Sequence, residues 1–218
     1  MAWFVKFLKS SIGHKLVMSL TGLFLIIFLL IHLGGNLQLL RNDDGAAFTA
    51  FVEFMETNPL VKISAYILYA GFLIHIIQGI LLWLENRKAR GGQNYAVKSS
   101  YKTTWAARNM PLLGGILLVF LIIHMGDFWR ELKFGDLADE DLYNDVIHAF
   151  KNPIILVIYE IGMVALFFHL SHGFQSAFQT LGLNHSKYNL CIKRLGMIYA
   201  VVVALAFFLI PLLVFFLK

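Results

Sequence analysis

Five long apolar stretches dominate the sequence, at about residues 16–40, 60–84, 111–130, 153–181 and 195–217. A membrane-spanning helix needs about 20 mainly apolar residues, and a backbone in hydrocarbon must satisfy its polar groups within the segment. The stretches lack the alternation that barrel strands require. The pattern therefore predicts an all-α fold, an integral membrane bundle of five transmembrane helices that forms one domain over residues 1–218.

Proline and asparagine mark three of the predicted helix starts, because proline at the first helical position loses no useful hydrogen bond. The pairs are Asn58-Pro59, Met110-Pro111 and Asn152-Pro153. The third stretch is short and reaches full length only by including polar residues at its ends. Pro211 lies inside the fifth stretch, where we expect it to kink the helix or to lean on a neighbour.

Composition agrees with a membrane protein, since 59% of the residues are hydrophobic, 14% are charged and the mean hydropathy is +0.72. A water-soluble domain has no use for so much apolar surface. Twelve of the 18 Lys and Arg residues fall in the leader and in the second and fourth connections. Positive charge near the spans stays cytoplasmic, so we expect a cytoplasmic N-terminus and an outside C-terminus.

The connections carry three further signals. Residues 43–57 and 138–150, both predicted to be outside, have apolar residues at helical spacing and are expected to form interfacial helices. The basic cytoplasmic face suits anionic lipid headgroups or a soluble partner, and the charge requires no nucleic acid. Cys191 is the only cysteine, which excludes an internal disulfide and a thiolate cluster, and we interpret it as a packing residue.

Histidines are the informative residues. Four of the eight follow an apolar triplet and occupy the first four spans, one in each: His32, His75, His124 and His169. An ionisable side chain within a span is costly and faces the bundle interior with a partner. A single such residue would be explained by a hydrogen bond between helices. Four of them in four successive helices favour a ligand role.

Depth sorts the four histidines into two pairs, because a helix rises about 1.5 Å per residue. With the predicted topology, His32 and His124 lie roughly 25 and 22 Å from the cytoplasmic edge, in the outer leaflet. His75 and His169 lie roughly 20 to 24 Å from the outer edge, in the inner leaflet. Two pairs at two depths are the geometry of two bis-histidine haems stacked across a membrane. The chain lacks a CxxCH motif for covalent attachment, so the haems are expected to be haem b.

Small residues on the same helix face accompany the inner pair. Gly71 and Gly79 flank His75 at a spacing of four, and Gly173 follows His169 at the same spacing. Such stripes admit a flat porphyrin but also serve plain helix packing. His172 lies one turn beyond His169, and either could be the ligand. We favour His169, with His172 as a neighbour of a haem propionate or of quinone.

The four spans and their histidines match a known family through the strings GLFLIIFLLIHL, GFLIHIIQG, LLVFLIIHM and FFHLSHGFQSAFQTLGL. The chain resembles the di-haem cytochrome b membrane anchor of succinate:quinone oxidoreductases, in its b558-type single-subunit form. The resemblance implies a subunit of a bacterial cytoplasmic membrane complex, a succinate dehydrogenase or fumarate reductase. It would anchor an FAD-containing flavoprotein and an iron–sulfur subunit and pass electrons to quinone, usually menaquinone, without a succinate-oxidising site of its own.

The resemblance also implies roles for individual residues. His75 and His169 would hold the haem proximal to the iron–sulfur subunit, and His32 and His124 the distal one. Quinone would bind near the distal haem, with Glu53 or Glu56 as its carboxylate, unless both are ordinary solvated charges. Some members carry a glutamate two residues before the proximal ligand for proton movement. Phe167 occupies that position here, and Glu160 lies too near the outer end to replace it.

Polar groups at the cytoplasmic ends of the spans are expected to neutralise haem propionates. The candidates are Lys15, Ser19 and Arg108, which could equally be simple positive-inside residues. Two other functions stay open. One is a di-haem b anchor for a different quinone-linked dehydrogenase, and the other is a transporter that uses the intramembrane histidines as a relay.

Overall fold

The computed structural model describes residues 2–91, 104–134 and 142–218, and every regular element in this part of the chain is a helix. Five helices are long and apolar enough to cross a membrane, at Ser11–Leu40, Pro59–Ala89, Met110–Trp129, Pro153–Thr180 and Ser186–Leu217. These five confirm the predicted all-α fold with five helices of membrane-spanning length. In order, the elements are α1 (Ala2–Leu8), α2 (Ser11–Asn36), η1 (Leu37–Leu40), α3 (Ala46–Thr57), α4 (Pro59–Arg90), α5 (Trp105–Arg108), α6 (Met110–His124), η2 (Met125–Trp129), α7 (Arg130–Phe134), α8 (Leu142–Lys151), α9 (Pro153–Thr180) and α10 (Ser186–Leu217).

Helix starts agree with the proline and asparagine signals. The Asn58 side chain accepts a hydrogen bond from the backbone N–H of Leu60 at 2.9 Å, at the start of α4. Asn152 caps α9 in the same way through the N–H of Ile154, also at 2.9 Å. These caps satisfy N–H groups that have no partner inside the helix. Asn109 precedes α6 without a side-chain cap, and its amide donates to the carbonyl of Trp105 instead.

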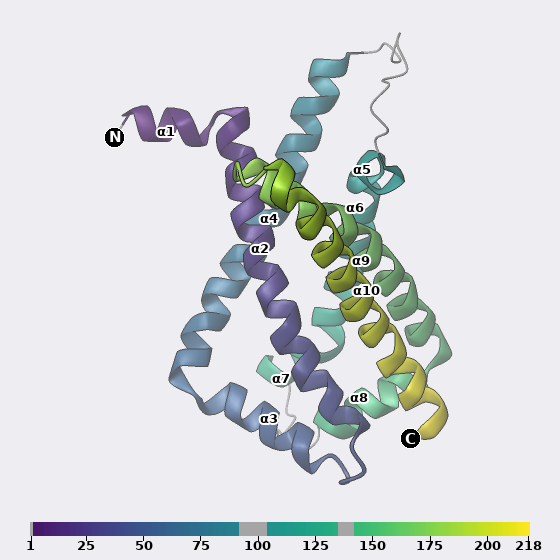
Figure 1. Ribbon diagram of the computed structural model, residues 1–218. Coiled ribbons are helices and arrows are strands. Elements are labelled where there is room, and N and C mark those ends of the chain that lie inside the picture. Colours follow the sequence, from purple (N-terminus) through teal and green to yellow (C-terminus); the bar gives the residue numbers. More distant parts are fainter. Residues whose placement is uncertain (1, 92–103, 135–141) are drawn as a thin grey trace.

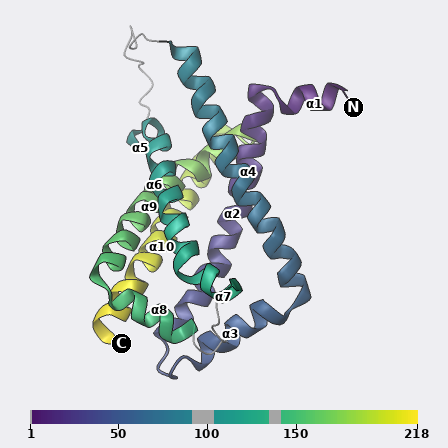
Figure 2. The same ribbon diagram turned by 180° about the vertical axis from the view of Figure 1, so that it is seen from behind.

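The bundle is organised around α9, which packs against α10, α2 and α6 (Figures 1 and 2). Helix α4 packs mainly on α2 and reaches α6 and α3 with fewer contacts. The Tyr199 hydroxyl of α10 donates to the carbonyl of Ile26 in α2 at 2.6 Å. The four helices that carry the candidate histidines therefore share one interior, and α10 supports them from one side.

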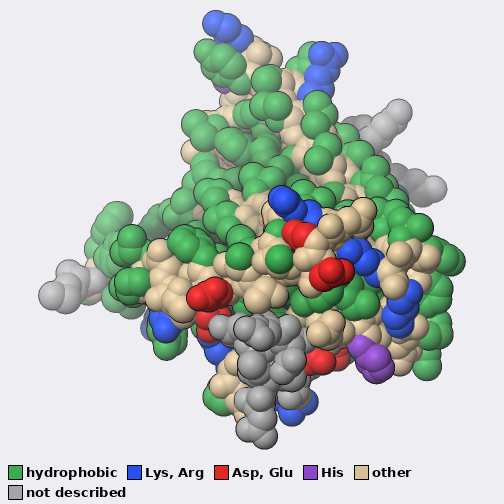
Figure 3. Space-filling model, turned by 90° about the horizontal axis from the view of Figure 1, so that it is seen from below, with side chains coloured by type: hydrophobic (Ala, Val, Ile, Leu, Met, Phe, Trp, Pro, Cys, Tyr) green, Lys and Arg blue, Asp and Glu red, His purple; other side chains and the backbone are tan. Residues whose placement is uncertain are grey.

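Short helices α3 and α8 close one end of the bundle, where they contact each other (Figure 1). Buried Phe48 and Val52 of α3 and Leu142, Val146 and Phe150 of α8 belong to the same hydrophobic core as the α9–α10 seam. Seen from this end, acidic and basic side chains gather over the middle of the face, with hydrophobic side chains around them (Figure 3). The two helices confirm the helical prediction for these connections, although residues 138–141 lie outside the described residues.

Most of the basic residues predicted to be cytoplasmic lie at the opposite end, where α2 begins, α4 ends and α10 begins (Figure 1). Lys98 and Lys102 lie outside the described residues. The direction in which the bundle crosses a membrane stays a prediction.

The expectation for Pro211 agrees with the structure in one of its two alternatives, whereas the expectation for Cys191 does not. Pro211 is buried, and α10 continues through it to Leu217, so the neighbouring helices support this position. Cys191 is exposed, so its interpretation as a packing residue is wrong. The first turns of α10 present the neighbouring Ile192 toward α9, and the 100° step of the helix turns Cys191 away from the bundle.

A close approach between α9 and α6 supplies a test of the packing. A Cβ atom added at Gly162 would lie 2.7 Å from Cδ2 of the Phe120 ring. We therefore expect Gly162→Ala to destabilise the bundle by about 1–3 kcal/mol, as overpacking of a dense interior does. The thermal unfolding midpoint of the purified protein in detergent measures the effect.

The control for this substitution is Phe120→Leu, which makes room for the added methyl group. The double variant Gly162→Ala with Phe120→Leu should lose less stability than the two single changes predict when added. Additive losses would contradict the proposed clash between these two residues.

Candidate functional site

His32 and His124 meet at the end of the bundle that α3 and α8 close. His32 comes from the last turns of α2 and His124 from the last residue of α6. Their ring centroids are 5.7 Å apart and the ring planes are inclined by 80°. Phe28 and Phe120 stack on the two imidazoles at 5.2 and 5.6 Å. We call this the outer pair.

His75 and His169 form the second pair, from the middle of α4 and of α9. Their ring centroids are 6.2 Å apart and the planes are inclined by 65°. The structure thus brings together the same two pairs that depth sorted along the sequence. Of the two candidate histidines on α9, His169 is the one whose ring contacts His75. We call this the inner pair.

The two pairs lie at different levels of the same helices. A Cβ added at Gly22 of α2 would lie 3.3 Å from His75, whereas His32 comes ten residues later, about 15 Å along the helix. Helix α6 repeats this spacing, because a Cβ at Gly114 would lie 4.0 Å from His169 and His124 again follows ten residues later. The pairs therefore stand one above the other inside the bundle.

Each pair spans a gap that suits a metal ion between two imidazoles. An imidazole nitrogen lies about 2 Å from a bound metal, so two rings on opposite sides of one ion have centroids about 6 Å apart. Both pairs are close to this separation. Among the described residues no group of three or more His, Cys, Asp or Glu side chains could hold a metal ion. A group that brings its own nitrogen ligands, as haem does, needs only the two histidines.

The second ring nitrogen of a metal-binding histidine usually donates to a neighbouring acceptor, which fixes the ring. His75 Nδ1 lies 3.2 Å from the Thr21 hydroxyl oxygen, and that hydroxyl donates to the Val17 carbonyl at 2.8 Å. His124 Nδ1 lies 3.2 Å from the Tyr159 hydroxyl oxygen. In both rings this leaves Nε2 for a metal. Nδ1 of His169 is buried and has no hydrogen-bond partner in the described part of the chain.

Comparison with known proteins gives a relative that fits this arrangement. The chain is 25% identical over 158 residues to the "Succinate dehydrogenase cytochrome b558 subunit" of Bacillus subtilis (strain 168). The chain is similar to a cytochrome b558. The match covers 72% of this chain and 73% of the relative, and it confirms the family resemblance indicated by the histidine-bearing strings. No protein-family model and no solved structure matches the chain.

The small residues predicted to accompany the inner pair lie in two environments. A Cβ at Gly71 would meet the Phe24 ring at 3.1 Å, and one at Gly79 would meet Met18 at 3.4 Å. Both glycines thus face side chains of α2, as the helix-packing alternative requires. A Cβ at Gly173 would meet no atom within 4 Å, so the space beside His169 is open on this side.

The propionate candidates lie toward the basic end. Ser19 is 6% exposed, and its hydroxyl donates to the carbonyl of Lys15 at 2.9 Å. Lys15 and Arg108 are exposed, and Arg108 ends the short helix α5. His172 is partly buried one turn beyond His169. These four residues lie on the inner-pair side of the bundle, and within the described residues none of them forms a hydrogen bond or a ring contact with a paired histidine.

The carboxylates predicted for quinone lie on α3. Glu53 is exposed, whereas Glu56 forms an ion pair with Lys133 of α7. A third carboxylate lies nearer to the outer pair. Asp127 accepts a hydrogen bond from the Tyr159 hydroxyl at 3.3 Å, and Tyr159 touches His124. Sequence reasoning missed Asp127, although its position three residues after His124 was a signal that the two share a helix end.

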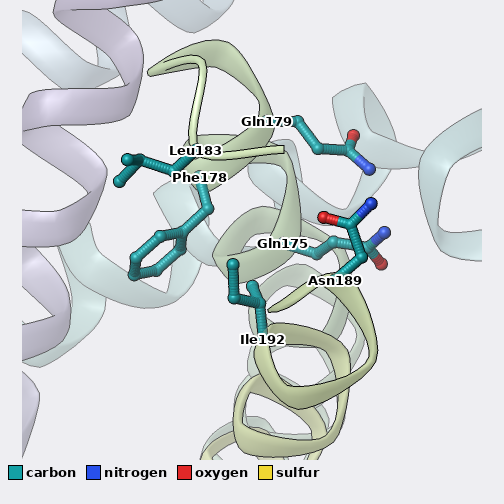
Figure 4. Close-up of a pocket in the computed structure, with 6 residues that line it drawn as sticks. All are labelled: Gln175, Phe178, Gln179, Leu183, Asn189 and Ile192. Atoms are coloured by element: carbon teal, nitrogen blue, oxygen red, sulfur yellow. The ribbon is translucent and has the colours of Figure 1, made fainter. Parts of the chain in front are cut away.

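A shallow pocket lies at the turn between α9 and α10 (Figure 4). Three amide side chains, Gln175, Gln179 and Asn189, line one part of it, and Phe178, Leu183 and Ile192 line the rest. Figure 4 shows the amides beside one another, apart from the Phe178 ring. None of the paired histidines lines this pocket, so it is separate from both pairs.

The ion pair between α3 and α7 yields a prediction. Glu56→Lys places two positive charges together and should lower the stability of the bundle by about 1 kcal/mol, the scale of a partly exposed pair. Adding Lys133→Glu restores opposite charges and should recover the loss. The thermal midpoint in detergent at low salt is the measurement.

Glu53→Lys is the matched control for this test, because Glu53 is an exposed carboxylate of the same helix. It should leave the midpoint within the range of ordinary surface substitutions, about 0.5 kcal/mol. Equal losses at Glu53 and Glu56 would mean that the ion pair does not hold α3 to α7.

Proposed function

We propose that this chain is the di-haem cytochrome b anchor of a succinate:quinone oxidoreductase. The observation that carries the proposal is the meeting of four histidines from four spans as two ring pairs, each at a separation that suits bis-imidazole ligation. The similarity to a succinate dehydrogenase cytochrome b558 subunit supports the assignment of the complex. Two haem b groups would then lie one above the other in the bundle.

Each ligand has a role that its surroundings support. His75 and His169 would hold the inner haem, and His32 and His124 the outer one. When bound, haem supplies one-electron chemistry, and the protein adjusts it through ligands, burial and hydrogen bonds. Thr21 and Tyr159 orient the rings of His75 and His124 by accepting from their Nδ1–H groups. The aromatic side chains around the outer pair exclude water from it.

The two polar ends of the bundle would bind different partners. The basic end would face the cytoplasm and carry the iron–sulfur subunit and the flavoprotein, so that electrons pass between it and the inner haem. Lys15, Ser19 and Arg108 would lie near the propionates at that end. Quinone, in the form of menaquinone, would react near the outer pair. There Glu53 is the exposed carboxylate, since Glu56 is engaged with Lys133.

An anchor for a different quinone-linked dehydrogenase would use the same two pairs, and the identity of the co-purified subunits separates it from a succinate:quinone oxidoreductase. A histidine relay for transport needs a connected chain of ionisable groups. The rings meet instead as two separate pairs about 15 Å apart along α2 and α6, with the apolar residues of the helices between them. The geometry therefore favours two cofactor sites.

The ligand assignment is tested by a reduced-minus-oxidised spectrum of the purified complex. Wild type should contain two low-spin haems with a split α band. His32→Leu should lose the outer haem and His75→Leu the inner one, so that each variant keeps about half of the haem per protein. Leucine preserves the apolar character of each helix.

His148→Leu is the matched control, because His148 is exposed on α8. It should retain both haems. Loss of neither haem in His32→Leu and His75→Leu, or loss of the same haem in both, would refute the pairing.

A separate pair of variants decides between the two inner candidates on α9. Because the ring of His169 contacts His75, His169→Leu should lose the inner haem and keep the outer one. His172→Leu should keep both haems with bis-histidine low-spin spectra. The opposite result, with the inner haem lost only in His172→Leu, would transfer the ligand role to His172.

A further inference from the structure

Three side chains form a hydrogen-bonded chain at the outer pair. His124 Nδ1 lies 3.2 Å from the Tyr159 hydroxyl oxygen, and that hydroxyl lies 3.3 Å from Oδ2 of Asp127. Tyr159 is only 4% exposed. Its ring packs against Phe120, Phe128 and Phe150 with centroids 5.1 to 6.2 Å apart. The packed ring therefore fixes the position of the hydroxyl oxygen.

Chemistry fixes the direction of the two hydrogen bonds. An ionised carboxylate can only accept, so the Tyr159 hydroxyl donates to Asp127. The hydroxyl oxygen then accepts from His124 Nδ1, which must carry its proton. This tautomer leaves the lone pair on Nε2, the nitrogen that a metal requires.

A local widening of the helix after His124 places Asp127 next to Tyr159. The turn Met125–Trp129 is a π-helix, which widens the helix directly after His124. Trp129, at the end of the same turn, donates to the Tyr69 hydroxyl of α4 at 2.8 Å. The turn is thus tied to α9 through Asp127 and to α4 through Trp129.

The other paired histidines have different supports. The hydroxyl that faces His75 donates to a neutral backbone carbonyl. The amide of Asn36 lies 3.5 Å from both ring nitrogens of His32. Within the described part of the chain, only the support of His124 ends in a carboxylate. When the group that accepts from Nδ1–H is itself bonded to a negative charge, the imidazole becomes a stronger electron donor. It then stabilises the oxidised form of a bound metal.

We infer that Tyr159 and Asp127 are positioning residues of the outer haem site, which hold His124 in one tautomer and lower the reduction potential of the haem bound there. The inference rests on the proposed function, since it requires a haem at the outer pair. It adds Asp127 to the site and gives Tyr159 an effect on the reduction potential, and both residues act through the ligand without touching the cofactor.

Tyr159→Phe in the intact complex tests the inference, because it removes the acceptor and keeps the ring. A redox titration followed in the α band should show the outer haem easier to reduce, while the inner haem is unchanged. We expect the ratio of reduced to oxidised outer haem at a fixed potential to rise roughly tenfold, which is about 59 mV for a one-electron couple. Asp127→Asn should shift the same haem in the same direction by less.

Because Asp127 acts through the tyrosine, Asp127→Asn should add little in the Tyr159→Phe background. The matched control is Tyr199→Phe, which removes another intramembrane hydroxyl, one that donates to the Ile26 carbonyl. It should leave both potentials unchanged. Loss of the outer haem alone from both test variants would also support the positioning role.

Unchanged potentials in Tyr159→Phe and Asp127→Asn would overturn the inference, and so would an equal shift in Tyr199→Phe. These outcomes differ from a failure of the proposed function. In that case wild type itself lacks two haems, or His32→Leu and His75→Leu fail to remove different ones.

Discussion

The cost of placing an imidazole in hydrocarbon is the constraint on which this structure depends. Each of α2, α4, α6 and α9 carries one paired histidine, and a polar ring that faced lipid would have no hydrogen-bond partner. The cost is avoided only when the ring points into the bundle, and this fixes the rotation of each helix about its axis. Ile31 and Ile74, which directly precede His32 and His75, are accordingly exposed on the outside, and so is Ile122, two residues before His124.

Helix α10 carries no intramembrane histidine and has a different task. Its buried residues include Gly196, Ala200, Ala204 and Val203, which allow a close approach to α9. At Gly196 an added Cβ would lie 2.7 Å from the Phe174 ring. Small residues are the usual means of close packing between membrane helices, where lipid competes with every apolar contact. The α9–α10 seam is therefore a closely packed part of the bundle, against which α2 and α6 lie.

Much of this arrangement could be predicted from the sequence. The spans follow from apolar length, the starts of α4 and α9 from Asn-Pro pairs, and the pairing of the histidines from a rise of about 1.5 Å per residue. Each of these three predictions uses either a single helix or the depth of a residue along its helix. The contact between Asp127 and Tyr159 depends on the relative rotation of α6 and α9 and on a π-turn, neither of which a hydropathy pattern contains. The ion pair of Glu56 with Lys133 and the exposure of Cys191 were missed for the same reason.

The two pairs differ in what surrounds them, and the difference follows from the ends of the bundle. Near the inner pair, the support of His75 comes from a neighbouring helix through a hydroxyl and a backbone carbonyl, all neutral groups. The outer pair lies next to a face closed by α3 and α8, where acidic and basic side chains gather (Figure 3). Asp127 is only partly buried, so water can stabilise its carboxylate, which the middle of the bundle does not allow. A charged group behind His124 is therefore tolerated at the outer pair. Under the proposed function, this is also the end of the bundle where quinone would need protons as well as electrons.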